Sequence, residues 1–365
     1  MLAFYLPQFH PIPENDVWWG RGFTEWSNVA RARPLYPGHY QPHVPSELGF
    51  YDLRLPEARS AQAQLAAEHS IEGFCYWHYW FQGKRLLERP FEEVLRSGKP
   101  DFPFALAWAN ESWSRRWLGE ERDVLQEQTY SAADDRAHAD WLARAFGDTR
   151  YVRVEDRPLF LIYRPNHLAD PLATTRTIRE VCRAEGVGDP YLVGINAHCT
   201  HIDCRTLGFD DTLHFEPQLG VLPDFSHDGP AFGKLARNLR TGIPSTDLKV
   251  YDDESARALM TAMRPSWPLL RTVFVGWDNT ARRGRNGVIV AGSTPERFER
   301  ALARAVDEVC RERPAHQRLL FLNAWNEWAE GNHLEPDFRF GRQFLEAVKR
   351  VNAPELSLAV AEGRE

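Results

Sequence analysis

Two glutamates three residues apart, Glu327 and Glu330, follow an apolar run at residues 319–322 that predicts a buried strand. Cleavage of a glycosidic bond needs one carboxyl group to protonate the leaving oxygen and a second to act as nucleophile or base. Trp325 adds a flat apolar face that can stack on a sugar ring, and Asn326 adds an amide that can bind hydroxyl groups. An isolated Glu-X-X-Glu pattern is more often a solvated loop, but these neighbours favour a catalytic carboxylate pair.

Aromatic and polar side chains also gather where the other predicted strands end. A single Trp at a strand end is more often core packing than a ligand contact, but convergence from nearly every strand favours a binding site. Glu111, Glu216 and Asp278 are further carboxylates that could act in place of the pair. The candidate substrate-binding residues are Tyr5, Gln8, His10, Trp18, Trp19, Glu25, Trp26, Trp77, His78, Tyr79, Trp80, Trp108, Asn110, Glu111, Trp113, Tyr163, Asn196, His214, Glu216, Trp277, Asp278, Trp325 and Asn326.

Eight short apolar runs predict β-strands, and amphipathic stretches predict helices between most of them. The runs are mostly continuous rather than alternating, which is typical of parallel strands buried on both faces. Eight strand–helix alternations predict an α/β fold, a single (β/α)8 TIM barrel with its active site at the C-terminal strand ends, and a doubly wound sheet is the main alternative. The predicted strands are residues 2–6, 73–77, 104–108, 159–163, 191–195, 212–215, 272–277 and 319–324, and the predicted helices are residues 56–69, 86–96, 132–146, 173–185, 254–263, a helix opening at residue 294, and 341–351.

The barrel is predicted to span residues 1–352 as one catalytic domain, followed by a C-terminal tail at residues 353–365. The connection after the first strand is long and rich in Trp, from Gln8 to His43. We predict that it has no regular structure and forms a wall over the active site, because long loops of this kind are usually functional.

The composition is that of an ordinary globular protein. Of 365 residues, 43% are hydrophobic and 26% are charged, which predicts neither a disordered chain nor a membrane span. The net charge of −7 and a pI near 6.0 oppose binding to nucleic acid. The 13 Trp residues suit a carbohydrate site, although large cores also use them. The expected partner is therefore an oligosaccharide or polysaccharide substrate.

Cysteine usage and the N-terminal segment bear on the compartment. The five cysteines, at positions 75, 182, 199, 204 and 310, are an odd and scattered set, which indicates reduced thiols in a cytosol. The first residues include no basic region, and their apolar run is too short for a signal peptide. If Met1 is the native start, the protein is expected to be cytoplasmic.

Four motifs carry a resemblance to a known family: YLPQFH at residues 5–10, WWGRGFTEW at 18–26, GHYQPH at 38–43 and WHYWF at 77–81. Through them the chain resembles, over essentially its whole length, the WbsX-type proteins of bacterial polysaccharide gene clusters, which are called glycoside hydrolase family 99-like. The resemblance implies a (β/α)8 barrel that acts on a polysaccharide.

The more distant family 99 proper consists of retaining endo-acting α-mannosidases and mannanases, and its motif resembles NEWAEG at residues 326–331. The resemblance implies that Glu327 removes a proton from the sugar 2-hydroxyl, that Glu330 is the general acid and base, and that the route passes through a 1,2-anhydro sugar. That family has His where this chain has Ala329, so the mannose preference does not carry over with the carboxylate pair.

Two other functions compete with a hydrolase. WbsX-type genes are commonly described as glycosyltransferases, but the sequence contains no Asp-X-Asp, no Gly-X-Gly-X-X-Gly turn and no phosphate loop. Arg282, Arg283 and Arg285 follow the seventh predicted strand, where barrels often bind phosphate; they could also bind a uronate, a sulfate or a phosphorylated sugar, or be solvated surface. A non-catalytic glycan-binding barrel is the third reading, but it would not need the carboxylates.

A metal or cofactor is not expected. His198, Cys199, His201, Asp203 and Cys204 cluster in sequence, but their spacing matches no standard zinc site, and a single loop rarely supplies four ligands.

Overall fold

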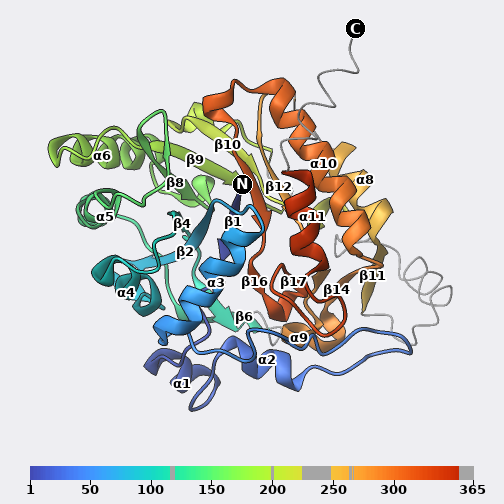
Figure 1. The fold of residues 1–365 in the computed structure, drawn as a ribbon. Coiled ribbons are helices and arrows are strands. Elements are labelled where there is room, and N and C mark those ends of the chain that lie inside the picture. The colour runs from blue at the N-terminus through green and yellow to red at the C-terminus, as the bar shows by residue number, and fades with distance from the viewer. Residues whose placement is uncertain (116–119, 199–200, 224–247, 263–264, 266, 353–365) are drawn as a thin grey trace, which may run out of the picture.

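The structure is a computed structural model that describes residues 1–365 except 116–119, 199–200, 224–247, 263–264, 266 and 353–365. At its centre, eight parallel strands close a barrel (Figure 1): each pairs with the next, and the last pairs with the first. This confirms the predicted (β/α)8 TIM barrel, since a doubly wound sheet would keep two unpaired edges. The predicted C-terminal tail lies outside the described residues. The barrel strands are β1 (Leu2–Tyr5), β2 (Gly73–Phe81), β4 (Phe104–Trp108), β8 (Arg157–Ile162), β9 (Tyr191–Asn196), β10 (Asp211–His214), β12 (Leu270–Phe274) and β15 (Leu320–Asn323).

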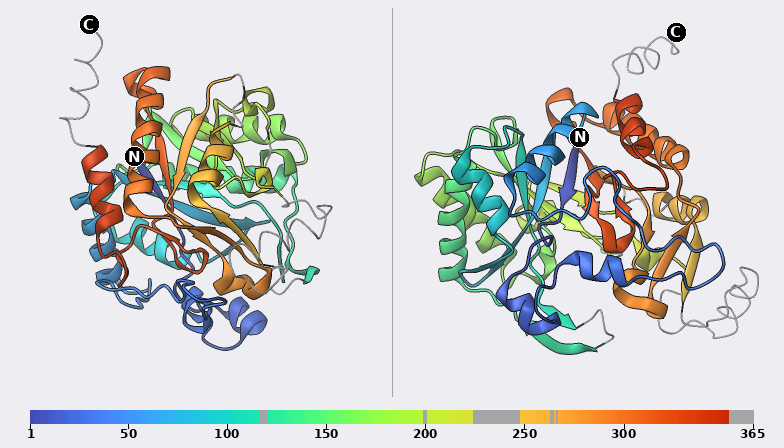
Figure 2. Two further views of the ribbon diagram at one scale, coloured as in Figure 1. Left: turned by 90° about the vertical axis from the view of Figure 1, so that its right-hand side faces the viewer. Right: turned by 60° about the horizontal axis from the view of Figure 1, so that its bottom comes forward.

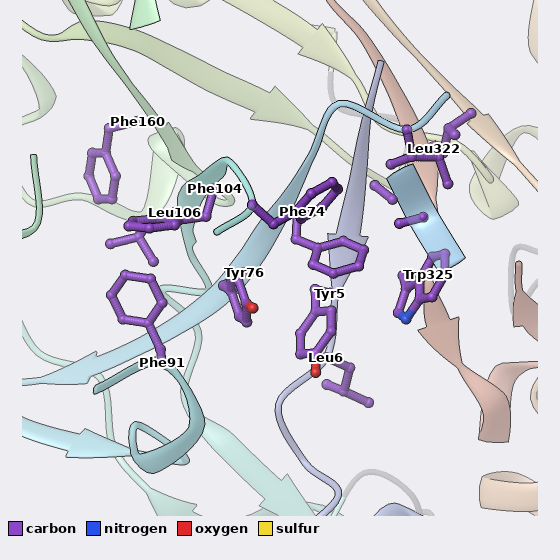
Figure 3. Close-up of a cluster of buried hydrophobic side chains, with 14 of the residues drawn as sticks. Tyr5, Leu6, Phe74, Tyr76, Phe91, Phe104, Leu106, Phe160, Leu322 and Trp325 are labelled. Atoms are coloured by element: carbon purple, nitrogen blue, oxygen red, sulfur yellow. The ribbon is translucent and has the colours of Figure 1, made fainter. Parts of the chain in front are cut away.

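Successive residues of the barrel strands face the barrel interior and the surrounding helices in turn. On β1, Phe4 belongs to the interior cluster, whereas Ala3 and Tyr5 belong to the cluster between strands and helices. Figure 3 shows part of this outer cluster, where the Phe74 ring lies 4.9 Å from Tyr5 and 5.0 Å from Trp325 between ring centroids. Burial on both faces explains why the strands read as continuous apolar runs.

Helices cover the outside of the barrel (Figures 1 and 2), close to their predicted positions. Ser131 and Thr294 cap two of them, because each side chain accepts a hydrogen bond from a backbone amide of the first turn. Between β9 and β10, the described residues include a 3-10 turn, η3 (Cys204–Leu207), and no α-helix. The covering helices are α3 (Pro56–Glu68), α4 (Arg89–Ser97), α5 (Ala132–Phe146), α6 (Pro171–Ala184), α8 (Asp253–Ala262), α10 (Pro295–Glu312) and α11 (Gln343–Val351).

The long connection after β1 contains two helices, α1 (Pro13–Trp19) and α2 (Glu25–Arg31), so the prediction of a loop without regular structure is wrong. Each helix has seven residues, too few for the sequence to show a repeated apolar stripe. Thr24 and Ser27 form a reciprocal capping box at the start of α2. The connection lies at the carboxyl ends of the barrel strands, at the bottom of Figure 1 and in front in the right-hand view of Figure 2.

Shorter elements complete this end of the barrel. Trp277 was expected to close the seventh barrel strand, but β12 ends at Phe274. Trp277 lies instead in a separate three-stranded sheet, in which β14 pairs antiparallel with β13 and parallel with β11. These elements are β3 (Lys84–Leu86), β5 (Trp113–Arg115), β6 (Glu120–Gln126), β7 (Arg153–Val154), β11 (Lys249–Asp252), β13 (Trp277–Asp278), β14 (Val288–Ala291), β16 (Asn326–Glu327), β17 (Asn332–His333), the helix α9 (Thr280–Arg283) and the 3-10 turn η7 (Trp328–Glu330).

Gly194 on β9 offers a test of the barrel packing. A Cβ atom at this position would lie 2.5 Å from Sγ of Cys204 and 3.3 Å from Cγ of Pro165. We expect Gly194→Ala to lower the free energy of unfolding by about 1–3 kcal/mol, because the packed neighbours must move. Gly147→Ala is the control, since its Cβ would meet nothing closer than 3.5 Å. Urea unfolding followed by circular dichroism measures both, and equal losses would contradict the prediction.

None of the helices in the described part of the chain is long and apolar enough to cross a membrane.

Candidate active site

A cavity of about 360 Å³ opens at the carboxyl ends of the barrel strands. The connection after β1 contributes Gln8 and Trp19 to its lining, β2 contributes Trp77, and the segment after β15 contributes Glu327 and Glu330. The connection therefore forms part of the wall around the carboxylate pair. In TIM-barrel enzymes this end of the barrel carries the active site.

Arg282 lies at the centre of the site and bonds three carboxylates. Its Nε donates to Oε1 of Glu25 at 2.8 Å, its Nη2 donates to Oε2 of Glu327 at 2.9 Å, and its Nη1 donates to Oε1 of Glu330. The side chain of Glu25 is fully buried, whereas those of Glu327 and Glu330 are 10% and 21% exposed. Of these three carboxylates, Glu330 is thus the one that a ligand can reach most easily.

The four charged groups come from four different elements. Glu25 opens α2, Arg282 lies on α9, Glu327 ends β16, and Glu330 ends η7. The glycine after Glu330 has a φ of 57°, and a Cβ atom there would lie 3.1 Å from the backbone nitrogen of Asp278. A glycine at position 331 therefore allows the loop with the carboxylate pair to pack directly against β13.

Burial raises the pKa of both Glu327 and Glu330. The positive charge of Arg282 lowers both pKa values but does not offset burial, and the negative charge of Glu25 raises both further. If all three carboxylates were ionised, they would outnumber the guanidinium by two charges in a buried site. We therefore expect the pair to keep a proton near neutral pH, which provides one proton donor and one proton acceptor.

Aromatic rings form much of the remaining wall. The Trp77 ring stacks on Phe4 at 4.8 Å between centroids and meets the rings of Tyr163 and Phe215 edge-on at 5.4 and 5.8 Å. Tyr163 and Phe215 also line the cavity. Their mutual packing holds the rings in place, and such faces suit the apolar faces of sugar rings.

The polar wall includes two further predicted side chains. Burial raises the pKa of Tyr79, so its hydroxyl stays neutral and can donate a hydrogen bond to a ligand. Glu111 lines the cavity but is paired with Arg164, at 2.8 Å from Oε1 to Nε, which makes it a weaker catalytic candidate than the pair. The predicted site residues that line the cavity are Gln8, Trp19, Trp77, Tyr79, Glu111, Trp113, Tyr163, Trp277, Glu327 and Glu330.

Several predicted aromatic contacts do not line the cavity and belong to the core. Trp325 is fully buried, and the Trp108 indole donates to the backbone carbonyl of Trp80 at 3.2 Å. Because side chains alternate along a strand, a Trp near a strand end can face the helices as easily as the cavity. We therefore withdraw as ligand contacts the core residues Tyr5, Trp26, Trp80, Trp108 and Trp325.

Most predicted polar contacts also lie outside the cavity lining, where they bond to other parts of the protein. Oδ1 of Asn326 accepts from the backbone amide of Leu6 at 2.7 Å, and a carboxylate oxygen of Asp278 lies 2.7 Å from Nε2 of His39. Glu216 lines a different cavity, between α8, α10 and β12. The predicted polar residues that are buried outside the lining of the cavity with the carboxylate pair are His10, His78, Asn110, Asn196, His214, Glu216, Asp278 and Asn326.

Two predicted residues do not line the cavity but contact residues that do. Trp18 meets the ring of Trp113, which lines the cavity, edge-on at 5.8 Å. Glu25 accepts a hydrogen bond from Arg282 and does not line the cavity.

Comparison with known proteins identifies the family. A model of the family described as "Glycosyltransferase WbsX" matches residues 1–348. The chain belongs to the WbsX family. Two relatives from strains of Xanthomonas campestris pv. campestris, each called uncharacterized protein WxcX, are 41% identical over 373 residues, which cover 99% of this chain and 51% of the relative. The chain thus spans about half the length of the curated relatives that it matches.

Two solved structures similar to this WbsX-family chain are described as a glycoside hydrolase of family GH99 and as a glycoside hydrolase-like protein. A GH99 endo-α-mannosidase from Bacteroides thetaiotaomicron matches with a TM-score of 0.57 and 14% identity, over 99% of this chain and 98% of that one. A glycoside hydrolase-like protein matches with a TM-score of 0.59 and 14% identity, over 96% of this chain and 92% of that one. At this identity the likeness shows a shared fold, and the family match confirms the resemblance carried by the sequence motifs.

Several cavity residues of this WbsX-family chain were not predicted from the sequence. Arg282 stood out only as a possible anion-binding residue, because its partners lie far from it in sequence. Asn15, His198, Asn279 and Asn323 also line the cavity. Single asparagines and histidines are common in any sequence, so no pattern of residue types distinguished them.

Two groups of residues contain side chains of the kinds that bind metal ions. In the cluster considered from the sequence, residues 199–200 lie outside the described structure, and the Cys204 thiol is buried. Elsewhere, the potential ligand atoms of His43, His333 and Asp337 lie within 4.8 Å of one another. Nδ1 of His43 lies 2.9 Å from Nε2 of His333, and Asp337 accepts a hydrogen bond from Tyr40 at 2.9 Å. These bonds account for the cluster as a structural network beside the site.

Proposed function

We propose that this WbsX-family chain is a retaining endo-glycoside hydrolase that acts on a bacterial surface polysaccharide. The observation that carries the proposal is the pair Glu327 and Glu330, both held by Arg282 at an aromatic-walled cavity at the carboxyl end of the barrel. Two carboxyl groups that share a proton are what glycoside cleavage requires.

In this proposal Glu330 is the general acid and base, because it is the more exposed carboxylate of the pair. It protonates the leaving oxygen while Glu327 takes the proton of the sugar 2-hydroxyl, whose oxygen attacks the anomeric carbon. Water then opens the 1,2-anhydro sugar, with its proton passing to Glu330 and the Glu327 proton returning to the 2-oxygen. The raised pKa of Glu327 makes its carboxylate a stronger base once it is ionised.

A glycosyltransferase is the second candidate, favoured by the description of the matching family model. A transferase needs an activated donor sugar, so the two functions differ in what they consume. Cationic side chains in the cavity, Arg282 and Arg283, are compatible with either.

Incubation of the protein with purified bacterial surface polysaccharides tests the proposal. We expect shorter oligosaccharides with new reducing ends, detected by mass spectrometry, without any added nucleotide sugar. Activity is expected to survive EDTA, because the proposed steps use only side-chain carboxyl groups. Products that lengthen only when a nucleotide sugar is supplied would overturn the hydrolase proposal and favour the transferase.

A further inference from the structure

Three polar side chains that line the cavity leave hydrogen-bonding atoms without partners among the described residues. Asn15 is fully buried, and neither its Oδ1 nor its Nδ2 is hydrogen bonded. Nε of Arg283 and Nε1 of Trp277 are also buried without an acceptor. Three of these four atoms are donors, so most of the unpartnered polar atoms call for an acceptor from a ligand.

The charged side chains of the cavity lining also indicate that an anionic ligand is needed. Glu327 and Glu330 share Arg282, and Glu111 is paired with Arg164. Arg283 lines the cavity and is only partly buried, yet within the described part of the chain it forms no ion pair and its guanidinium forms no hydrogen bond. A guanidinium in a partly enclosed site is stabilised most by an anionic group whose two oxygens accept two parallel hydrogen bonds.

Arg283 differs from the nearby arginines Arg282 and Arg285 in its surroundings. Arg282 is occupied by carboxylates, and Arg285 is exposed on the 3-10 turn η5 (Gly284–Asn286) and does not line the cavity. Of the three arginines in this segment, Arg283 is therefore the one that both reaches the cavity and lacks a carboxylate partner among the residues described.

We propose that the cavity recognises a glycan that carries an anionic group, a carboxylate or a phosphate, and that Arg283 binds this group. This inference rests on the proposed glycan-cleaving function and specifies its substrate class. The free amide of Asn15 can bind a sugar hydroxyl through either atom, and the Trp277 indole can donate to a further oxygen. The sugar that carries the anion thus supplies acceptors for the unpartnered donors of Arg283 and Trp277.

Matched pairs of small sugars test the proposal by binding alone. The probes are both anomers of the methyl glycosides of glucuronic, galacturonic and mannuronic acid, each beside its neutral parent hexoside. Glucose 6-phosphate and UDP form the phosphate arm. Titration calorimetry at low salt should show at least one acid bound about tenfold or more tightly than its neutral partner. A preference confined to the carboxylates indicates a uronate, and one confined to the phosphates indicates a phosphorylated sugar or nucleotide donor.

Arg283→Gln should reduce the acid-to-neutral affinity ratio to near one, whereas the control Arg285→Gln should keep it. Thermal unfolding of both variants establishes that they fold. Arg283→Lys should keep part of the preference, since the charge remains without the planar pair of donors. Equal binding of acids and neutral partners by the unaltered protein, or an unchanged preference in Arg283→Gln, would overturn the proposal.

The outcome is separable from the test of the proposed function. An Arg283-dependent preference for anions without any cleavage of polysaccharides would remove the hydrolase assignment and leave the anion site. Cleavage of an anionic polysaccharide at the same rate and the same KM by Arg283→Gln and the unaltered protein would leave the hydrolase and remove the anion site.

Discussion

Glu327→Gln and Glu330→Gln are each expected to lower kcat on a cleavable polysaccharide by about 10²–10⁴-fold, because each change keeps the shape of the side chain and removes its proton chemistry. Binding of oligosaccharide products should change far less. Both measurements apply to the same protein samples, with rates from reducing-end release and affinities from calorimetry. Glu312→Gln, an exposed residue on α10, is the control.

The two variants should differ in how they respond to the leaving group. If Glu330 is the acid, an activated aryl glycoside, whose phenolate departs without protonation, should restore much of the first-step rate in Glu330→Gln. It should not do so in Glu327→Gln, which cannot activate the 2-hydroxyl. Near-normal rates in either variant would refute the assignment of that residue, and restoration in Glu327→Gln instead would exchange the two roles.

Arg282→Met is also expected to have a large effect. It should lower the free energy of unfolding and shift the pH dependence of the reaction rate. It leaves Glu25, Glu327 and Glu330 buried without their cation, and removal of one partner from a buried ion pair typically costs about 3–5 kcal/mol. Because Arg282 lowers the pKa of Glu327 and Glu330, its loss should raise both. The ascending limb of the pH–rate profile, where the base ionises, should therefore move to higher pH.

The same pKa change fixes the sign of the stability effect. A carboxyl whose pKa is higher in the folded state than in the unfolded state binds more protons when folded between those two values, so stability falls as pH rises through that range. Arg282→Met should thus lose more stability at pH 8 than at pH 5, measured by urea unfolding. Arg285→Met is the exposed control, and adding Glu25→Gln to Arg282→Met should recover part of the loss. A loss independent of pH, or no recovery, would contradict the central role of Arg282.

The sequence alone determined the architecture, because it depends on local patterns. The apolar run at residues 104–108 coincides with β4, and residues 132–146 coincide with α5, because burial on both faces and capping residues leave readable signals. The run at residues 73–77 gives the start of β2, which continues to Phe81. The family also followed from motifs in the chain, and the model match confirms it. The closeness of Glu327 and Glu330 was readable for the same reason, since they are neighbours along one short segment.

The tertiary structure decided which of the candidate side chains face the cavity. Trp77 and Trp325 both follow apolar strand residues, yet Trp77 lines the cavity and Trp325 packs in the outer core (Figure 3), because side-chain direction at a strand end depends on local backbone geometry. Only the fold brings Arg282 to Glu25, 257 positions away in the chain. The charge balance that sets the pKa values of the pair depends on distances between elements, which the linear order of residues does not contain. The same is true of Arg283, which has no carboxylate partner among the described residues.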